Sequence, residues 1–400
     1  MSPRLYLPAM AVGTCLGLGK AANAAGLFAG CRDGLAPRDG YLPGKAVPLG
    51  ALPEEPPPLP DDLAGRWDSR NNRLLMALAA EIADDVAGAV RRYGRDRIAI
   101  VIGTSTSGIA EGEAALSHFR AAGTWPEGFH YSRQETGSGA AFLADLLGLG
   151  GPAYVVATAC SSSAKVFASA RRLIRAGLAD AALVGGADTL CKLTVAGFHS
   201  LESVSPTPCN PFGANRDGIT IGEGGALFLL TREEAEIALL GVGESSDAHH
   251  ISAPDPEGRG ALAAMEGALA DAGLGAGDIA YVNLHGTATR LNDSMESKAV
   301  HALFGGAVPC SSTKALTGHT LGAAGAVEAA FLWLGLSAAW NAGNLVPPQV
   351  WDGVADPELP RLGLAAPGGR LAGGDRLAAL SNSFAFGGSN CSLVLGRGWA

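Results

Sequence analysis

The chain has 400 residues, of which 48% are hydrophobic and 57 are glycine, enough for one large globular unit or two closely fused halves. A formal net charge of −9 argues against nucleic acid as a partner, and no uncharged apolar segment is long enough to span a membrane. The seven cysteines are scattered, odd in number and without paired metal-ligand spacing, which favours a reducing, cytoplasmic location.

Strand-like and helical segments alternate along the chain, a rhythm that predicts an α/β protein with buried sheets. The proline-rich stretch 43–60 predicts an excursion on the surface. Residues 4–24 fit two interpretations: a secretory signal ending in Ala22-Asn-Ala24, or the first strand, turn and helix of the fold. The expected strands occupy residues 97–102, 153–156, 181–184, 225–230, 279–283 and 377–380.

Cys160 stands where the apolar segment 155–159 meets a helical segment, 164–178. Three serines, 161–163, offer helix-capping hydroxyls between the two. A helix N-terminus carries unpaired N–H groups and a partial positive charge, so it favours a thiolate and can hold an oxyanion. A small buried core cysteine is the alternative for this residue considered alone.

Two histidine motifs favour the interpretation of Cys160 as a nucleophile. His285 lies in Asn283-Leu-His-Gly-Thr-Ala-Thr289 after a short strand, and His319 ends the run Lys314-Ala-Leu-Thr-Gly-His ahead of the helical segment 321–340. A lone histidine or lysine is usually structural, but all three side chains fall in loops flanked by Gly and Thr. One cysteine, two histidines and Lys314 therefore predict an acyl-transfer site.

Six motifs, taken together, resemble the β-ketoacyl-acyl carrier protein synthases of the condensing-enzyme type I/II group. They run from Thr158 to the C-terminus in the order and approximate spacing of that family. The motifs are Thr158-Ala-Cys160-Ser-Ser, Pro211-Phe-Gly-Ala-Asn-Arg216-Asp217-Gly218, Gly222-Glu223-Gly224, His285-Gly-Thr-Ala-Thr289, Lys314 through His319-Thr-Leu-Gly-Ala-Ala-Gly325, and Ser381-Asn-Ser-Phe384-Ala-Phe386-Gly-Gly-Ser-Asn390.

The resemblance implies a thiolase-like α/β fold, in which two similar βαβ-rich halves stack as α-β-α-β-α layers. Residues 1–231 are expected to carry the nucleophile, and residues 232–400 the two histidines. The family begins with a strand, a glycine turn and a helix, so we interpret residues 4–24 as part of the fold. No cofactor is implied.

The resemblance also implies catalytic roles. Cys160 takes the acyl chain, and its own N–H and that of Phe386 hold the oxyanion. Neutral His285 and His319 then stabilise the enolate formed when malonyl-acyl carrier protein loses CO₂. Lys314 folds back beside the site, with Glu296 as its expected partner.

Substrate contacts follow from the same resemblance. Thr287 and Thr289, two residues apart, place both hydroxyls on one side of an extended loop and are implied to contact the phosphopantetheine arm. Phe386 is implied to gate the acylated cysteine, Phe384 fits either the site or the core, and Asp247 matches a position near the active-site water. Without the resemblance these would be loop-stabilising threonines and a surface carboxylate.

A buried polar cluster is the remaining implied feature. Glu328 lies in the apolar helical segment 323–336, where an unpaired charge is costly. We interpret it as a paired structural glutamate, with a bound monovalent cation as the alternative. The cluster comprises Asn283, Glu328, Ser381 and Asn382.

The acidic chain offers no long-range attraction to an acidic carrier protein, so carrier docking requires a local basic patch. Arg70 and Arg73 resemble a basic pair that contacts the carrier in the family, and ordinary surface arginines are the alternative. A second candidate is the group Arg171, Arg172 and Arg175. We expect a homodimer, or a heterodimer with a cysteine-lacking homologue, paired through the strand 153–157.

Three departures limit the resemblance. Ala385 stands where glycine is usual, and Arg290 replaces a common proline after the Thr-x-Thr segment. Thr106 stands where primary fatty-acid synthases carry a larger apolar residue, so it presents a hydroxyl and less volume at the acyl tunnel. Residues 103–109 resemble synthases of aryl-polyene pathways, which predicts a rigid unsaturated chain. A neutral replacement in an ordinary fatty-acid enzyme is the alternative.

Other functions are distinguished by single residues. A thiolase needs a second cysteine in a Cys-x-Gly setting, which Cys391 lacks. Chalcone-synthase-like and initiating enzymes use Cys-His-Asn instead of two histidines. A non-catalytic partner subunit that sets chain length has lost the nucleophile, and this chain keeps Cys160.

Overall fold

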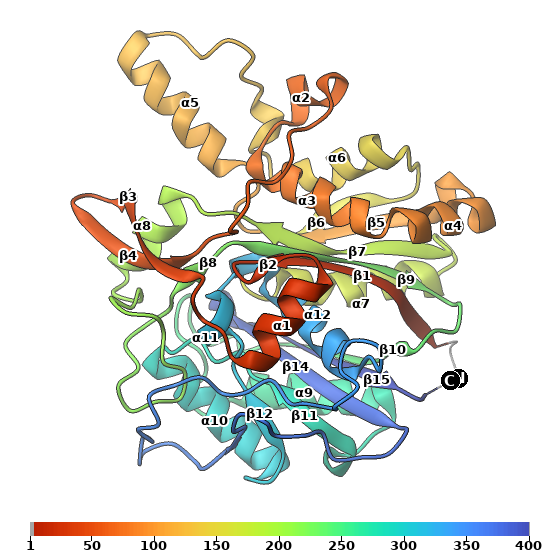
Figure 1. Cartoon of the computed structure of the whole chain (residues 1–400), viewed down its shortest axis with the longest axis vertical. Helices are drawn as coiled ribbons and strands as arrows, with labels where there is room; N and C mark the ends of the chain where they lie inside the picture. Colours follow the sequence, from red (N-terminus) through yellow and green to blue (C-terminus); the bar gives the residue numbers. More distant parts are fainter. Residues whose placement is uncertain (1–3, 400) are drawn as a thin grey trace.

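Two regions of one large sheet repeat the same strand order (Figure 1). The first reads β6-β5-β7-β9-β1 and the second reads β12-β11-β14-β15-β10. They join where β1 pairs with β10, through Leu5–Leu239 and Tyr6–Ala238. The strands are β1 (Leu5–Thr14), β5 (Ile98–Gly103), β6 (Ala153–Val156), β7 (Ala181–Asp188), β9 (Gly224–Thr231), β10 (Ile237–Ser246), β11 (Ile279–Asn283), β12 (Pro309–Ser311), β14 (Leu377–Ala385) and β15 (Ser389–Arg397). This is a computed structural model, which describes residues 4–399.

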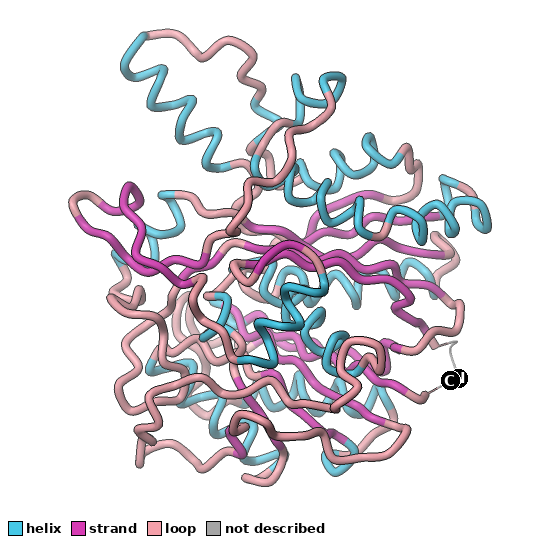
Figure 2. The backbone as a smooth tube through the Cα atoms, viewed as in Figure 1, coloured by secondary structure: helices cyan, strands magenta, loops and turns pink. Residues whose placement is uncertain are grey.

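Helices cover both regions of the large sheet and fill the space between them (Figures 1 and 2). Every residue of α12 (Ala324–Leu336) is buried, because it packs against α7 (Ser162–Arg175) and strands of both halves. The outer faces carry α3 (Arg70–Glu81) and α6 (Ser138–Leu147) on the first half, and α9 (Arg259–Ala272) with α10 (Arg290–Phe304) on the second. The predicted thiolase-like layering is confirmed.

The predicted strands form where the sequence is a run of β-branched, leucine and alanine residues. All six residues of β5, Ile98–Gly103, are buried, because parallel neighbours flank the strand and helices cover its faces. The N-terminal segment forms β1, β2 (Gly17–Leu18) and α1 (Lys20–Ala29), as the fold interpretation predicts. Gly17 has φ +134°, and a Cβ there would lie 2.6 Å from that of Ala22.

Part of the proline-rich stretch 43–60, predicted to be a surface excursion, belongs to a sheet. Its first part is β4 (Lys45–Gly50), which joins β3 (Leu35–Leu42) and β8 (Ile221–Gly222) in a three-stranded sheet. Val47 and Leu49 are buried, so the prediction is wrong for this part. The small sheet matters because β8 also contacts the segment that carries His319.

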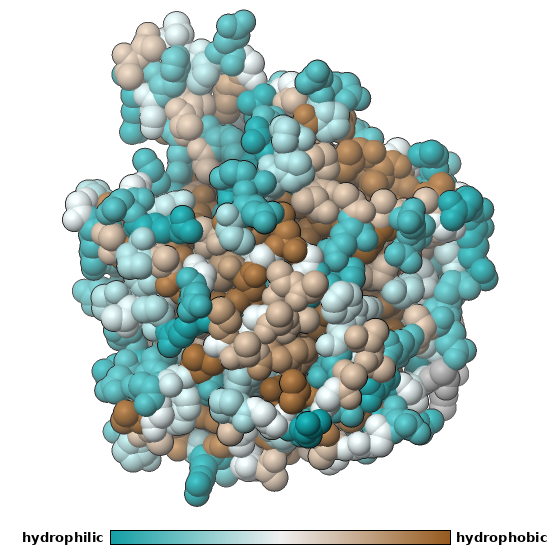
Figure 3. Space-filling model, in the orientation of Figure 1, coloured by the Kyte–Doolittle hydropathy of each residue, from teal (hydrophilic) through white to brown (hydrophobic). Residues whose placement is uncertain are grey.

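The remaining elements lie mostly at the periphery. In Figure 1, α5 (Ile109–Ala122) projects from the body, and in Figure 3 apolar atoms gather near the centre, where α1 lies, inside a more hydrophilic rim. No helix among residues 4–399 is long and apolar enough to cross a membrane. The other elements are α2 (Asp61–Trp67), α4 (Ala83–Tyr93), α8 (Lys192–Ser200), α11 (Lys314–Thr317) and β13 (Gly363–Leu364).

Candidate active site

Cys160 lies in a tight turn between β6 and α7. Ala159, which precedes it, has φ +53°, a left-handed conformation that is uncommon for alanine. The hydroxyl of Ser161 donates to Thr158 O at 3.0 Å, and that of Ser162 donates to Ala159 O at 2.5 Å. These serines therefore fasten the turn, and the prediction that they cap α7 is wrong for both.

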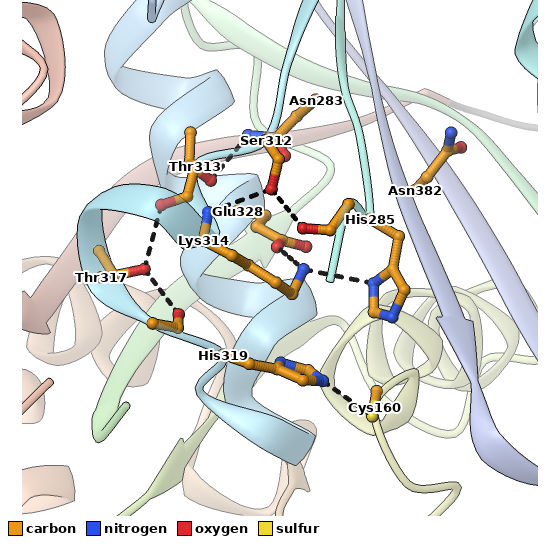
Figure 4. A network of polar contacts seen from close by, with 12 residues as sticks. Cys160, Asn283, His285, Ser312, Thr313, Lys314, Thr317, His319, Glu328 and Asn382 are labelled. Carbon is orange, nitrogen blue, oxygen red and sulfur yellow. Dashed lines mark hydrogen bonds and ion pairs between the residues drawn. The ribbon is translucent and has the colours of Figure 1, made fainter. Parts of the chain in front are cut away.

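Cys160 and the two predicted histidines come together (Figure 4). His319 Nε2 lies 3.0 Å from Cys160 Sγ, and the two imidazole rings are 5.4 Å apart at 87°. One ligand-type atom from each of the three residues lies within 4.8 Å of the others. Cys160, His285 and His319 are 7%, 1% and 2% exposed, so the cluster is shielded from water.

Lys314 reaches His285 from α11. Its Nζ lies 3.3 Å from His285 Nδ1 and forms an ion pair with Glu328 on α12, as Figure 4 shows. Glu328 is thus a paired glutamate, as predicted. The prediction that Lys314 pairs with Glu296 is wrong, because α12 packs Glu328 directly beside the ammonium.

Glu296 instead holds the backbone of the His285 loop. Its two carboxylate oxygens accept the N–H groups of His285 and Gly286, both at 2.7 Å, and Asn382 donates to it at 3.2 Å. Burial raises the pKa of Glu296 to about 7, although these donors oppose the shift. Glu296 therefore positions His285 through the main chain.

The turn that carries His319 is clamped on both sides. His319 N donates to Thr220 O at 2.7 Å, and Gly222 N donates to His319 O at 2.9 Å. The thiols of Cys15 and Cys209 donate to carbonyls of α11, those of Leu316 and Lys314, each at 3.4 Å. These contacts fix the position of the segment from Lys314 to His319.

Electrostatics keep the three central groups neutral. Burial raises the pKa of Cys160 to about 11, against opposing effects from Lys314 and the backbone N–H of Phe386. Burial, then Lys314, lower the pKa of both His285 and His319 well below 6.5. The resting pair is therefore a thiol beside a neutral imidazole.

A cavity of about 280 Å³ opens from Cys160 towards the surface. Thr287 and Thr289 line it with their hydroxyls 3.0 Å apart, which confirms that both face one side. Phe384 lies 6.1 Å from the His285 ring and also belongs to the core, and Phe386 packs 5.7 Å from Phe198. Asp247 also lines the cavity, as predicted. Its carboxylate accepts a hydrogen bond from the Asn390 amide at 2.6 Å, beside the loop that carries Phe386.

Three of the four residues in the implied polar cluster each leave one buried oxygen without a hydrogen-bond partner in the part of the chain that the structure describes. Asn283 Oδ1, Glu328 Oε2 and Ser381 Oγ have no partner among the described residues, and Asn283 and Ser381 are paired on adjacent strands. Asn382 does not belong to this group, because its amide binds Glu296 and Ser392. Cys160 and the histidines have zinc-type donors, but Lys314 beside His285 disfavours a second cation there.

The predicted docking arginines are engaged within the chain. Arg70 donates to the buried Glu223 at 2.7 and 3.0 Å and pairs with Glu55, so it is not a free surface cation. Arg73 makes a two-point pair with Asp68 at 2.6 and 2.7 Å. Of the second candidate group, Arg171 pairs with Asp271 and Arg172 pairs with Glu244.

Asp188, at the end of β7, is a buried residue that the sequence did not reveal. Its carboxylate accepts from the hydroxyls of Thr104 and Thr106 at 2.6 and 2.8 Å, and from Ala323 N at 3.0 Å. The Thr106 hydroxyl, expected at the wall of the acyl tunnel, is therefore held by Asp188. Thr106 does not line the cavity at Cys160 in the isolated chain.

Several known proteins are similar to this chain in sequence and in fold. Residues 67–235 match the sequence model described as "Beta-ketoacyl synthase, N-terminal domain", and residues 236–345 match "Beta-ketoacyl synthase, C-terminal domain". A chain of the solved "Ketosynthase (ApeO) in Complex with its Chain Length Factor (ApeC) from Xenorhabdus doucetiae" is 49% identical, with a TM-score of 0.93, over 99% of this chain and 98% of that one. This chain belongs to the β-ketoacyl synthase family.

Two further members of the β-ketoacyl synthase family place it more broadly. A β-ketoacyl synthase from Burkholderia phymatum is 27% identical over 99% of both chains, with a TM-score of 0.85. The "3-oxoacyl-[acyl-carrier-protein] synthase 2" of Rhizobium meliloti is 39% identical over 271 residues, and the matched segment spans 62% of that protein's length and 62% of this chain.

Proposed function

We propose that this chain catalyses the decarboxylative Claisen condensation of an acyl chain with malonyl-acyl carrier protein, giving a 3-oxoacyl-acyl carrier protein. The observation that carries the proposal is the 3.0 Å contact between Cys160 Sγ and a neutral His319, with His285 in the same cluster. A nucleophile beside a base, with a second histidine facing the same cavity, is the arrangement that acyl transfer requires.

In the first half-reaction, Cys160 Sγ attacks the thioester carbonyl and its proton passes to His319 Nε2. The N–H groups of Cys160 and Phe386 hold the oxyanion. The C–S bond to the carrier then breaks, and His319 returns the proton to the departing thiolate. The acyl chain is left on Cys160.

In the second half-reaction, the malonyl thioester loses CO₂ and becomes an enolate. Nε2–H of His285 donates to the enolate oxygen, because Lys314 occupies Nδ1. The enolate carbon attacks the acyl carbon on Cys160, the C–S bond breaks, and the released thiolate takes a proton from solvent. Thr287 and Thr289 hold the phosphopantetheine arm, and Phe386 gates the cavity.

We further propose that the chain works in aryl-polyene or related polyketide elongation, as a heterodimer with a chain length factor. The 49% identity to a chain of the ApeO–ApeC complex supports this over housekeeping fatty-acid synthesis. Among residues 4–399, β6 pairs only with β5, and Ala153 within it and Ala157 just after it are exposed, so it offers an edge for a partner. A homodimer is the second candidate. The seven free cysteines support a cytoplasmic location.

The test is mass spectrometry of carrier-bound products. The purified protein, with its chain length factor, is given an acyl-carrier protein and malonyl-carrier protein. We expect a 3-oxoacyl-carrier product extended by one C₂ unit, with release of CO₂. A protein that loads neither substrate and releases no CO₂ would refute the proposed condensation and leave a non-catalytic subunit as the better account.

A further inference from the structure

The active-site cavity is lined by one basic side chain. Glu202, Asp217 and Asp247 line this cavity, and among its lining residues Arg290 is the only arginine or lysine. The chain as a whole has a net charge of −9, so it does not attract anions at long range. An anionic substrate entering the cavity therefore depends on Arg290 for a favourable charge contact.

Arg290 is free to make that contact. It is exposed at the first position of α10, and none of the carboxylates among residues 4–399 forms an ion pair with it. Asp356, the acidic residue whose titration it affects, is already paired with Arg216 at 2.5 Å. Arg70 and Arg73, in contrast, are both held by carboxylates of this chain.

The backbone under Arg290 is fixed. Ala288 has φ +64°, a strained conformation for alanine, and two hydrogen bonds hold it there. Its N–H donates to Asp293 at 3.2 Å, and its carbonyl accepts from Gly218 N at 3.0 Å. Arg290 therefore projects from a rigid base, in the same segment as the cavity-lining residues Thr287 and Thr289.

We propose that Arg290 binds the phosphodiester of the phosphopantetheine arm. This rests on the proposed function, which brings such an arm into the cavity. The arm carries its one anionic group at the end joined to the carrier, which stays at the rim while the thioester reaches the buried Cys160. A guanidinium matches two phosphate oxygens with two parallel N–H donors, which an amide or proline cannot do.

The test compares binding of phosphopantetheine and pantetheine, which differ by the phosphate, in the full-length protein by calorimetry or NMR titration. We expect the wild type to bind phosphopantetheine about three- to tenfold more tightly, the range for a charge-assisted contact at a solvated rim. Arg290→Gln should bring that ratio close to one. Arg91→Gln, an equal charge change at an exposed position of α4, should keep the wild-type ratio.

Three outcomes would overturn the proposal. The first is an equal preference for the phosphate in Arg290→Gln and wild type, and the second is no preference in the wild type. The third comes from binding of the carrier protein itself, measured on the same variants. If Arg290→Gln weakens binding of the apo and holo carrier equally and leaves the ratio for the free arms unchanged, Arg290 contacts the carrier surface and not the arm. Because binding is measured without turnover, these results are separate from a failure of the condensation itself.

Discussion

Lys314 Nζ lies 3.3 Å from His285 Nδ1, and this contact fixes the chemistry of the histidine. An ammonium can only donate, so Nδ1 accepts and the single proton of the neutral ring sits on Nε2. Burial and Lys314 lower the pKa of His285 well below 6.5, which keeps the ring neutral. This tautomer supports the proposed role of His285 as a hydrogen-bond donor to the substrate.

His285→Ala should separate the two half-reactions. We expect decarboxylation of malonyl-carrier protein to fall by about a hundredfold or more, because the enolate loses a donor that acts mainly in the transition state. Transfer of the acyl chain to Cys160 should continue. Release of labelled CO₂ and the intact mass of the enzyme measure the two steps, and normal CO₂ release would contradict the assignment.

His319→Ala should slow the acylation of Cys160. From the sequence we expected both histidines to act mainly in decarboxylation and condensation, but His319 Nε2 lies 3.0 Å from a thiol whose pKa is raised to about 11. Acylation at pH 7 should therefore slow, because the thiol loses its proton acceptor. Raising the pH towards 10 should restore part of the rate in the variant by forming thiolate directly. An acylation rate equal to wild type at pH 7 would show that His319 takes no proton.

Removing only one partner of the Lys314–Glu328 ion pair should destabilise the folded protein. Both side chains are 2–3% exposed, so Lys314→Met leaves a buried, unpaired carboxylate. We expect the free energy of unfolding to fall by about 3 kcal/mol, and Lys314→Met/Glu328→Leu to recover part of that loss. Urea denaturation of the single and double variants measures this coupling. Additive losses would mean that the two groups do not interact.

Glu296 should make stability depend on pH. Its pKa is raised from 4.5 to about 7 in the folded chain, so the folded state binds more protons than the unfolded state between these values. Stability is therefore lost as pH rises from about 4.5 to 7, by about 3 kcal/mol from this group alone. Glu296→Gln should remove this part of the slope, measured by denaturation at a series of pH values. An unchanged slope would place the titration elsewhere.

Thr106 is buried against Asp188 and does not line the cavity, so its volume can act on a bound chain only by displacing its neighbours. We predict that the wild type prefers a 2,4-dienoyl carrier substrate to the saturated chain of equal length, and that Thr106→Ile reduces this preference. Thr106→Val keeps the volume but removes the 2.8 Å hydrogen bond to Asp188, so it is the matched control. Competition assays compare the three proteins. A preference for the saturated chain that Thr106→Ile leaves unchanged would refute the prediction.

Local patterns predicted much of the fold. The six strands and the N-terminal β1, β2 and α1 follow from runs of apolar residues and from glycine placement, which act over a few residues. The motifs also predicted that Cys160, His285, His319 and Lys314 meet. These side chains are fixed by loops whose sequences are themselves distinctive.

Partners within the site were harder to predict, because they depend on packing between distant segments. Lys314 is closer in sequence to Glu328 than to Glu296, but only the path of α12 shows which carboxylate faces it. Arg70 pairs with Glu223, which is 153 residues away. Asp188 gathers its donors from two segments far apart in the sequence, residues 104–106 and Ala323, and its only sequence signal is an acid at the end of an apolar strand.

The most direct test of the account is the mass of the intact enzyme after incubation with an acyl-carrier protein. We predict that the wild type gains one acyl chain and that peptide mapping places it on Cys160. Cys160→Ala should gain none, while Cys191→Ala, which alters a buried thiol outside the cavity lining, should load as the wild type does. Full loading of Cys160→Ala, or mapping of the acyl chain to another cysteine, would contradict the account.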